Sequence, residues 1–213
     1  MQRSSPRSRL RELLELARED VAVVVEKDPA CTGPWEVLLY PHLHALWLHR
    51  LANRQYHKGR RVLARSIALF GRVVSGGIDI HPGATIGRRF FIDHGCGVVI
   101  GETARIGDDV MLYHQVTLGA VGWWKDVRRP PGAPRHPTIE DGVVVGANSL
   151  VLGPITIGAR TKIGAHALVL ESVPPDSLVR GQAATVVQRQ PQAGPATADV
   201  LPQPVELPAR RAG

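Results

Sequence analysis

The stretch Ile100-Gly-Glu-Thr-Ala-Arg-Ile-Gly-Asp-Asp-Val-Met-Leu112 decides the fold, because an aliphatic residue returns in it at every sixth position. The same spacing runs through three groups of residues: Ile80, Ile86, Ile92 and Val98; then Ile100, Ile106, Leu112 and Leu118, shifted by two; and, after an interruption, Ile139, Val145, Val151, Ile157, Ile163 and Val169. A period of six is neither that of an α-helix nor the alternation of a single strand. It is typical of a parallel β-helix, in which short strands turn a corner every six residues.

Such a repeat builds a triangular prism, because three hexapeptides complete one coil of about eighteen residues and coils stack at about 4.8 Å. The recurring aliphatic side chain points inward, since the centre of the prism has room only for a column of apolar groups. A second inward position, four residues later, carries small or apolar side chains: Ala84, Ala104, Val110, Val116, Val143, Ser149, Ile155, Thr161 and Ala167. The same count places Cys96 at this position, as a small core residue.

The overall composition limits the class of protein. The chain has 213 residues, enough for one or two domains, and a net charge of +7. No helix-turn-helix, zinc or RNA-recognition signature accompanies this charge, so we expect no nucleic-acid partner. No stretch approaches the ~20 apolar residues of a membrane span, and the start lacks a secretory signal, so we expect no membrane association and a cytoplasmic location. Cys31 and Cys96 lie in different segments and indicate no disulfide framework.

Three segments are expected along the chain. Residues 1–78 form a helical domain, with helices predicted at these places: from Pro6, from near Trp35, from Pro41, and from about Arg60 to Val74. Residues 79–188 form the β-helix, from which an excursion loop at 119–136 departs, because paired Trp and Pro residues break the repeat there. Residues 189–213 are rich in Pro, Ala and Gln and are predicted to be disordered. The fold class is therefore α+β, an N-terminal α-helical domain followed by a left-handed parallel β-helix of hexapeptide repeats.

Ionisable residues are concentrated in the coils and at the end of the excursion: Asp79, His81, Asp93, His94, Glu102, His114, Arg135 and His136. Asp79 and His94 are fifteen residues apart, so the stacking of coils brings them toward each other. A carboxylate beside an imidazole fixes its tautomer and stabilises the charged ring after it has taken a proton. This pair therefore suits the activation of a hydroxyl group, which is too weakly acidic to attack a thioester unaided.

An ordered set of motifs resembles the serine O-acetyltransferase family over roughly residues 20–180. The motifs are Asp79-Ile-His-Pro-Gly-Ala-Thr-Ile-Gly87, Ile92-Asp-His94, Gly101-Glu-Thr103, Val116-Thr-Leu-Gly119, Arg135-His-Pro137 and Val173-Pro-Pro175, with Asp28-Pro29 and His44-Ala45-Leu46 upstream. The resemblance implies transfer of acetyl from acetyl-CoA to the hydroxyl of L-serine, giving O-acetyl-L-serine and CoA, the first step of cysteine biosynthesis from serine.

The resemblance also implies a role for each matching residue. His94 would be the general base and Asp79 its carboxylate partner. Asp28 and Asp93 would bind the serine ammonium. Arg135 and His136 would lie near the serine carboxylate and the reacting centre. Glu102 would be a supporting residue of the same substrate-binding pocket. Acetyl-CoA would bind along backbone groups at Ala120, Ala147 and Ala165, with Lys162 near the nucleotide end. No metal ion is expected.

The expected partners follow from the same resemblance. A prism leaves flat faces exposed, and hexapeptide proteins usually pack side by side as trimers, so we expect a homotrimer, with a dimer of trimers as the larger alternative. L-cysteine would act as a feedback inhibitor in the serine pocket. The chain ends in Ala212-Gly213 instead of the isoleucine that inserts into cysteine synthase, which argues against that complex.

Other readings stay open from the sequence. The acceptor could be another hydroxyl compound, such as a sugar, a xenobiotic or homoserine. A γ-type carbonic anhydrase would hold zinc with three histidines, but the spacing of His81, His94 and His114 does not match that site. A non-catalytic scaffold is the third reading. His81 is expected to be structural, and the pair Trp123-Trp124 either covers the cofactor or anchors the excursion.

Overall fold

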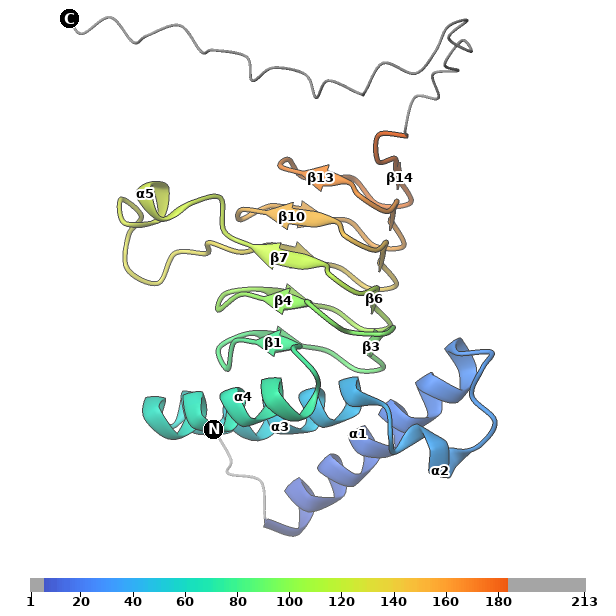
Figure 1. Cartoon of the computed structure of the whole chain (residues 1–213). Helices are drawn as coiled ribbons and strands as arrows, with labels where there is room; N and C mark the ends of the chain where they lie inside the picture. The colour runs from blue at the N-terminus through green and yellow to red at the C-terminus, as the bar shows by residue number, and fades with distance from the viewer. Residues whose placement is uncertain (1–5, 184–213) are drawn as a thin grey trace, which may run out of the picture. The chain divides into compact units, whose positions relative to one another are not determined.

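Four helices precede the repeats, and Figure 1 shows them gathered at one end of the stacked coils. The computed structural model describes residues 6–183, which contain α1 (Pro6–Lys27), α2 (Pro34–Val37), α3 (Pro41–His57) and α4 (Arg61–Val74). Proline opens α2 and α3, where its missing N–H would have had no intrahelical partner. The chain leaves α4 through Gly76 and Gly77, whose positive φ angles of 67° and 107° suit glycine. The helices predicted from the sequence are thus confirmed.

Short parallel strands follow, and within the described residues they form three sheets along the stack. Sheet A holds β1 (Asp79–Ile80), β4 (Val99–Ile100), β7 (Thr117–Gly119), β10 (Leu150–Leu152) and β13 (Leu168–Val169). Sheet B holds β2 (Thr85–Ile86), β5 (Arg105–Ile106), β8 (Thr138–Ile139) and β11 (Thr156–Ile157). Sheet C holds β3 (Phe91–Ile92), β6 (Met111–Leu112), β9 (Val144–Val145), β12 (Lys162–Ile163) and β14 (Leu178–Val179). From β1 to β13 successive strands enter the three sheets in turn, and before β14 an isolated parallel bridge from Val173 to Ile157 takes the place of a strand in sheet B. The chain therefore winds as a parallel β-helix.

Two edges of this prism position the predicted site. Corner C–A consists of the turns from sheet C to sheet A, at residues 93–98, 113–116, 146–149 and 164–167. Corner A–B consists of the turns from sheet A to sheet B, at residues 81–84, 101–104, 120–137 and 153–155. The excursion is the turn at 120–137 and carries α5 (Trp123–Asp126). It lies one residue later at each end than the predicted 119–136, because Gly119 still belongs to β7.

The core is the predicted column of aliphatic side chains. Apart from Ile86, which is partly buried, each residue of the six-residue count is buried, and the second inward positions contribute Ala84, Ala104, Val110, Val116 and Val143 among others. The prediction for Cys96 is wrong, because its side chain is exposed. The register pairs Asp79 with Val99, so the first coil has two residues more than the coil that pairs Val99 with Thr117. The extra residues lie in the turn at 93–98, which carries Cys96 out of the core.

The helices pack on the first coils. α3 and α4 lie against each other and against β1, and α1 contacts β3, where Val23, Leu43 and Phe91 share a small apolar cluster. Ion pairs fasten the end of α1 to the coils, since Lys27 Nζ lies 3.1 Å from an Asp109 carboxylate oxygen. The described residues up to Gln182 form one compact unit. The predicted domain boundary at residue 78 is thus a change of secondary structure, and its standing as a domain boundary stays a prediction.

The far end of the chain lies outside the described residues. These stop at residue 183, so the predicted end of the β-helix at 188 and the predicted tail at 189–213 are beyond them. In the part of the chain that the structure covers, no helix has both the length and the apolar character needed to cross a bilayer.

Candidate active site

The residues singled out in the sequence fall mainly at two different corners of the prism. Corner C–A carries Asp93, His94, Ala147 and Ala165, and corner A–B carries Glu102, Ala120, Arg135 and His136. Three others lie elsewhere: Asp28 follows α1, Asp79 starts β1, and Lys162 lies exposed on β12. The structure of one chain therefore brings the predicted residues together in two groups and leaves these groups apart.

His94 lies in the enlarged turn at 93–98. Its backbone has φ 61°, and Gly95 and Gly97 also have positive φ angles of 66° and 71°, so the loop bends outward in a conformation that glycine favours. The His94 side chain is 78% exposed, and its Nε2 lies 3.7 Å from Asp93 Oδ1. The ring of His114, in the next turn of the same corner, meets it edge to face at 6.2 Å between centroids. An imidazole open to solvent beside a carboxylate can exchange protons with a bound ligand.

Asp28 belongs to the same neighbourhood. Tyr40 donates a hydrogen bond of 2.5 Å from its hydroxyl to Asp28 Oδ2, and the N–H of Ala30 donates to Oδ1 at 2.8 Å. These hydrogen bonds, with a smaller effect from the charge of nearby His94, lower the pKa of the Asp28 carboxyl below its ordinary value. Asp28 thus stays ionised and adds a second carboxylate near His94.

Asp79 has a different partner from the one predicted. Its Oδ2 lies 3.2 Å from Nη1 of Arg72 on α4, and no contact with His94 occurs among the described side chains. The prediction assumed coils of about eighteen residues. The enlarged turn makes the first coil two residues longer, and the His94 ring lies in solvent. The backbone of Asp79 does reach the end of that turn, since its N–H donates to Val98 O at 2.9 Å.

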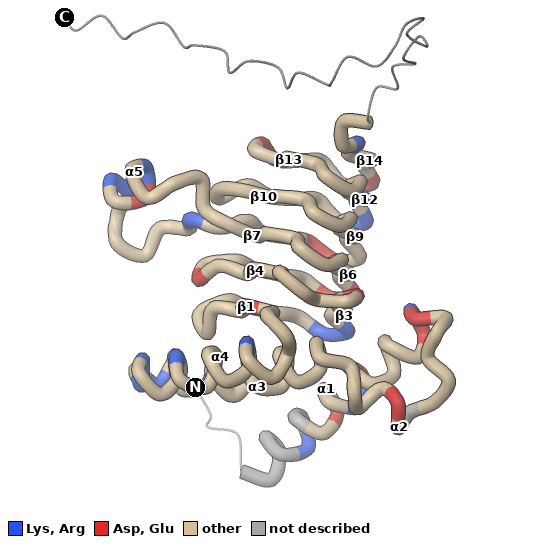
Figure 2. Tube along the Cα trace, in the orientation of Figure 1, with Lys and Arg blue, Asp and Glu red and all other residues tan. Residues whose placement is uncertain are grey.

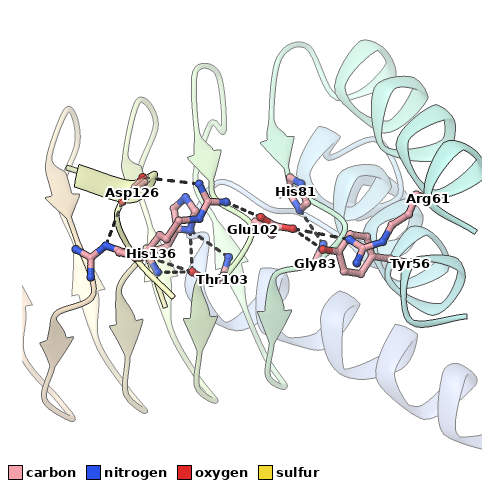
Figure 3. Close-up of polar contacts among 10 residues, drawn as sticks. Tyr56, Arg61, His81, Gly83, Glu102, Thr103, Asp126 and His136 are labelled. Atoms are coloured by element: carbon pink, nitrogen blue, oxygen red, sulfur yellow. Dashed lines mark hydrogen bonds and ion pairs between the residues drawn. The ribbon is translucent and has the colours of Figure 1, made fainter. Parts of the chain in front are cut away.

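Corner A–B holds a connected network of side chains, drawn in Figure 3. Glu102 accepts a hydrogen bond from the Tyr56 hydroxyl at 2.5 Å and another from Arg135 Nη2 at 2.5 Å. The hydrogen bond from Tyr56 and, to a lesser degree, that from Arg135 lower the pKa of the Glu102 carboxyl against the opposing effect of burial. Glu102 therefore remains a carboxylate that links α3 to the end of the excursion.

Asp126, at the end of α5, completes this network. Its side chain is only 9% exposed, and it lies 3.3 Å from Arg129 Nε and 3.7 Å from Arg135 Nη1. The Arg135 guanidinium thus lies between two carboxylates, Asp126 and Glu102, with about a third of its side chain still exposed. Neither Asp126 nor Tyr56 was predicted from the sequence. The sequence signal that was available for Asp126 is its position as the single acidic residue in a basic excursion, whose Lys and Arg residues Figure 2 shows around α5.

His136 is held by the backbone and side chain of Thr103. The N–H of Thr103 donates to His136 Nδ1 at 3.1 Å, and the Thr103 hydroxyl lies 2.9 Å from the same nitrogen. Burial, together with the positive charge of Arg135, lowers the pKa of the His136 imidazole. The ring is therefore neutral near pH 7 and acts here as a hydrogen-bonding group.

A cleft of about 800 Å³ lies under the excursion at corner A–B. Its lining includes Tyr56, Glu102, Arg135, Trp123 and the prolines of the excursion. Trp123 is 74% exposed and meets Trp124 edge to face at 6.4 Å between ring centroids. An exposed tryptophan that lines a cleft does not anchor the excursion within its own chain. The interpretation of the tryptophan pair as an anchor therefore loses support.

Three other histidines, His81, His42 and His49, have structural surroundings. His81 Nδ1 accepts the N–H of Gly83 at 2.9 Å, and burial lowers its pKa to about 4, as expected for a structural residue. His42 and His49 are buried on α3. Among the described residues, no three His, Cys, Asp or Glu side chains gather where they could hold a metal ion. His81 lies at corner A–B and His94 at corner C–A, so these two do not share a site in one chain.

Comparisons with known proteins agree on one family. A profile described as bacterial transferase hexapeptide (six repeats) matches residues 136–171. The serine acetyltransferase of Mycobacterium tuberculosis is 49% identical over 184 residues, which cover 85% of this chain and 77% of that protein.

Solved structures give the same result. Serine acetyltransferase isoform 3 of Entamoeba histolytica, in complex with cysteine, has a TM-score of 0.76 and 38% identity over 86% of this chain and 63% of its own. This chain thus spans less than two thirds of the Entamoeba protein. The Neisseria gonorrhoeae serine acetyltransferase, in complex with serine, has a TM-score of 0.72 and 38% identity over 82% of this chain and 69% of its own. The resemblance noted in the sequence is confirmed, and the chain belongs to the serine acetyltransferase family of acyltransferases.

Proposed function

We propose that this chain transfers the acetyl group of acetyl-CoA to the hydroxyl of L-serine, giving O-acetyl-L-serine and CoA, the first step of cysteine biosynthesis from serine. The family supports the reaction type. The single observation that carries the choice of acceptor is the pair of groups at the two corners. One group offers carboxylates beside a solvent-exposed imidazole, and the other offers a guanidinium held between two carboxylates.

The chemistry follows from these two groups. Nε2 of His94 takes the proton of the serine hydroxyl as its oxygen attacks the thioester carbonyl carbon. The tetrahedral intermediate then expels the CoA thiolate, which receives the proton from the His94 imidazolium. Asp79, the predicted partner of His94, can support this charge only after its carboxylate leaves Arg72, whereas Asp93 already lies beside the ring.

The acceptor is bound by complementary charges. The carboxylates of Asp28 and Asp93 suit the serine ammonium, and the Arg135 guanidinium suits the serine carboxylate. Glu102 holds Arg135 and does not itself need to touch the substrate. A sugar or a xenobiotic would leave these charged groups without partners, which is costly in a partly desolvated site.

The active site is completed by a second copy of the chain. The segment from Val98 to Glu102, at about 3.3 Å per residue, separates the two corners by on the order of 13 Å, more than one serine molecule can bridge. Packing of corner C–A of one copy against corner A–B of the next would unite both groups in a shared cleft. A ring of three prisms satisfies this head-to-tail contact, which supports a homotrimer.

The face of α4 adds a further apolar surface for contacts between copies. Val62, Leu69, Phe70 and Val73 on this helix are between 58% and 81% exposed. Exposed apolar side chains in such number on one helix usually mark an interface. A dimer of trimers through the helices is the larger assembly that this face would allow.

Acetyl-CoA is proposed to lie along corner C–A. The turns that carry Ala147 and Ala165 are stacked here by close backbone packing, since the N–H of His166 donates to Ala147 O at 2.9 Å and Gly146 lies against the backbone of Ala165. Ala120 would approach the same ligand from corner A–B of the neighbouring copy. Lys162, on sheet C, carries a positive charge that suits the nucleotide phosphates.

Regulation and location complete the proposal. L-cysteine differs from L-serine only by a thiol in place of the hydroxyl, so it fits the same charged groups and would inhibit the reaction. The Entamoeba relative is in complex with cysteine, and the Neisseria relative is in complex with serine. A cytoplasmic location, a left-handed sense of the coil and the absence of a cysteine synthase complex stay predictions; the hexapeptide match and the structural neighbours support the handedness.

One assay tests the proposal. Purified protein is mixed with acetyl-CoA and L-serine, and the free CoA thiol is measured with a thiol reagent, beside homoserine, a hexose and an amino-sugar as rival acceptors. Turnover that is much faster with L-serine supports the assignment. Turnover with a rival acceptor and none with L-serine would reject the acceptor while keeping the acetyltransferase activity.

A further inference from the structure

Thr103 occupies a central position at corner A–B that no catalytic or binding role yet explains. It follows Glu102 in the turn at 101–104, opposite the point where the excursion rejoins the coils. Its hydroxyl oxygen accepts two backbone N–H groups from the other side of that junction, that of Arg135 at 2.8 Å and that of His136 at 3.1 Å. Figure 3 shows Thr103 and His136 side by side, next to Glu102. A single side chain thus ties the end of the excursion to the preceding coil.

The same hydroxyl fixes the proton on the His136 ring. A threonine oxygen has two lone pairs, and the two backbone N–H groups occupy both, so its own hydrogen is left to donate. The hydroxyl therefore donates to His136 Nδ1, which lies 2.9 Å from the Thr103 hydroxyl oxygen and also accepts the N–H of Thr103 at 3.1 Å. A nitrogen that accepts two hydrogen bonds carries no proton. The neutral ring must therefore carry its proton on Nε2.

The Nε2 atom of His136 is the one that can meet a ligand. It makes no hydrogen bond within the described residues, and it is not among the fully enclosed side-chain atoms without a partner, which are His42 Nε2 and His49 Nδ1. The ring lies over Gly101, where a Cβ atom would come within 1.9 Å of Cδ2 and 2.2 Å of Nε2. The absence of a side chain at Gly101 leaves room for the His136 ring, and the hydrogen bonds from Thr103 fix the orientation of the ring.

We propose that Thr103 is a positioning residue that holds His136 in the Nε2-protonated form beside Arg135, so that the ring donates an uncharged hydrogen bond to the carboxylate of the acceptor amino acid. This role rests on the proposed function, because it assumes an acceptor that carries a carboxylate. Arg135 supplies the charge for this carboxylate, and His136 supplies a directed donor at a fixed angle to it. Both backbone N–H groups that Thr103 binds belong to this pair, so one hydroxyl aligns both recognition groups.

The first test reads the tautomer directly and needs no substrate. Protein labelled with ¹⁵N at histidine is studied by NMR at about pH 8, above the ordinary pKa of imidazole, and the His136 signals are assigned by their loss in His136→Gln. The proposal predicts a neutral ring with its proton on Nε2. A ring protonated on Nδ1, or averaged between both forms, would overturn it. The result does not depend on serine turnover, so it is separable from a failure of the proposed function.

The second test uses kinetics with a conservative rescue. Thr103→Val keeps the shape of the side chain but removes the hydroxyl, so KM for L-serine should rise about 10-fold or more, while kcat and KM for acetyl-CoA stay within about 3-fold. Thr103→Ser keeps the hydroxyl and should restore KM to within about 3-fold of the wild-type value. The matched control is Thr138→Val on β8, because the Thr138 hydroxyl makes no hydrogen bond to any described residue.

Each outcome decides the point. An unchanged KM for L-serine in Thr103→Val, or no recovery in Thr103→Ser, would contradict the proposed role. An equal rise of KM in Thr138→Val would also contradict it, because the effect would then not depend on the hydrogen bonds of Thr103. If Thr103→Val does not fold, the wild-type tautomer still tests the proposal.

Discussion

The two corners that carry the candidate site are built in opposite ways. At corner C–A, His94 projects from an enlarged turn, its side chain is 78% exposed, and Asp93 lies within ion-pair distance of the ring. At corner A–B, hydrogen bonds and ion pairs hold Arg135 and His136 before any ligand arrives. The exposed imidazole at corner C–A can accept and release a proton, and the held side chains at corner A–B can bind the carboxylate of a substrate. We therefore expect changes at corner C–A to act on kcat and changes at corner A–B to act on KM for the acceptor.

The largest effect should come from removing the base. His94→Ala should lower kcat by about 10²-fold to 10⁴-fold, the usual contribution of a general base, with KM for L-serine changed much less. The melting temperature should not change, because the ring is exposed. The release of CoA thiol and a thermal melt measure the two quantities. His114→Ala, at the next turn of the same corner, is the control, and a kcat near the wild-type value in His94→Ala would show that the base lies elsewhere.

A methyl group at Gly101 should separate recognition from chemistry. Gly101→Ala would place Cβ 1.9 Å from Cδ2 of His136, so the ring must leave its position. We expect KM for L-serine to rise on the order of 10-fold or more, with a smaller change in kcat. Gly33→Ala is the matched control, because no atom lies within 4 Å of the corresponding Cβ and its φ of 177° is extended. A KM that stays at the wild-type value would show that His136 takes no part in binding the acceptor.

A smaller effect is expected from the excursion. Asp126→Asn removes one of the two carboxylates beside Arg135 and weakens the contact of α5 with Arg129. KM for L-serine should rise about 3-fold to 10-fold, since Glu102 still holds Arg135. Asp176→Asn breaks an exposed pair with Arg160 and should change neither KM nor stability measurably. Equal behaviour of the two variants would contradict the role given to the excursion.

Replacing the buried histidines should not change activity. It should change only the stability of the folded chain. Burial lowers the pKa of His42 to about 4, so the unfolded chain binds more protons than the folded chain between about pH 4 and pH 6.5. The free energy of unfolding should therefore fall as the pH falls through this window, by on the order of 2 kcal/mol for this residue down to about pH 5.

His42→Phe provides the comparison for this pH dependence. Phenylalanine keeps an aromatic ring against Phe91, which His42 meets edge to face at 5.1 Å, but it cannot take a proton. Urea unfolding at about pH 7.5 and pH 5 should show a smaller loss of stability in the variant than in the wild type. An equal loss in both proteins would show that His42 is not responsible.

Much of the fold could be predicted from the sequence, because the hexapeptide count is a local pattern. The count identified the buried column, and its phase shift after Asp93 and His94 corresponds to the enlarged turn in the structure. The two extra residues also explain why the prediction for Cys96 is wrong, since they carry its side chain outward. Asp79 contacts Arg72 in one chain, and its pairing with His94 stays a prediction.

The network at corner A–B could not be predicted in the same way. Tyr56 and Glu102 are 46 residues apart, and Thr103 and His136 are 33 apart across the excursion. Their contacts depend on how α3 and the excursion fold back on the coils, which no local spacing records. The resemblance supplied Arg135 and His136, but the residues that hold them became visible only in the structure.

The central claim is that the two corners meet between copies of the chain, and mixed assemblies test it most directly. Two variants, His94→Ala with a lowered kcat and Arg135→Ala with a raised KM, are each expected to be nearly inactive at an L-serine concentration near the wild-type KM. They are co-expressed with different affinity tags so that mixed trimers can be isolated and assayed at that concentration. In each mixed trimer, whether 2:1 or 1:2, one of the three shared sites combines an intact His94 from one copy with an intact Arg135 from its neighbour, which is about one third of the sites. The account predicts recovery of CoA thiol release with L-serine to about this fraction of the wild-type rate. Mixed trimers no more active than either variant alone would contradict it.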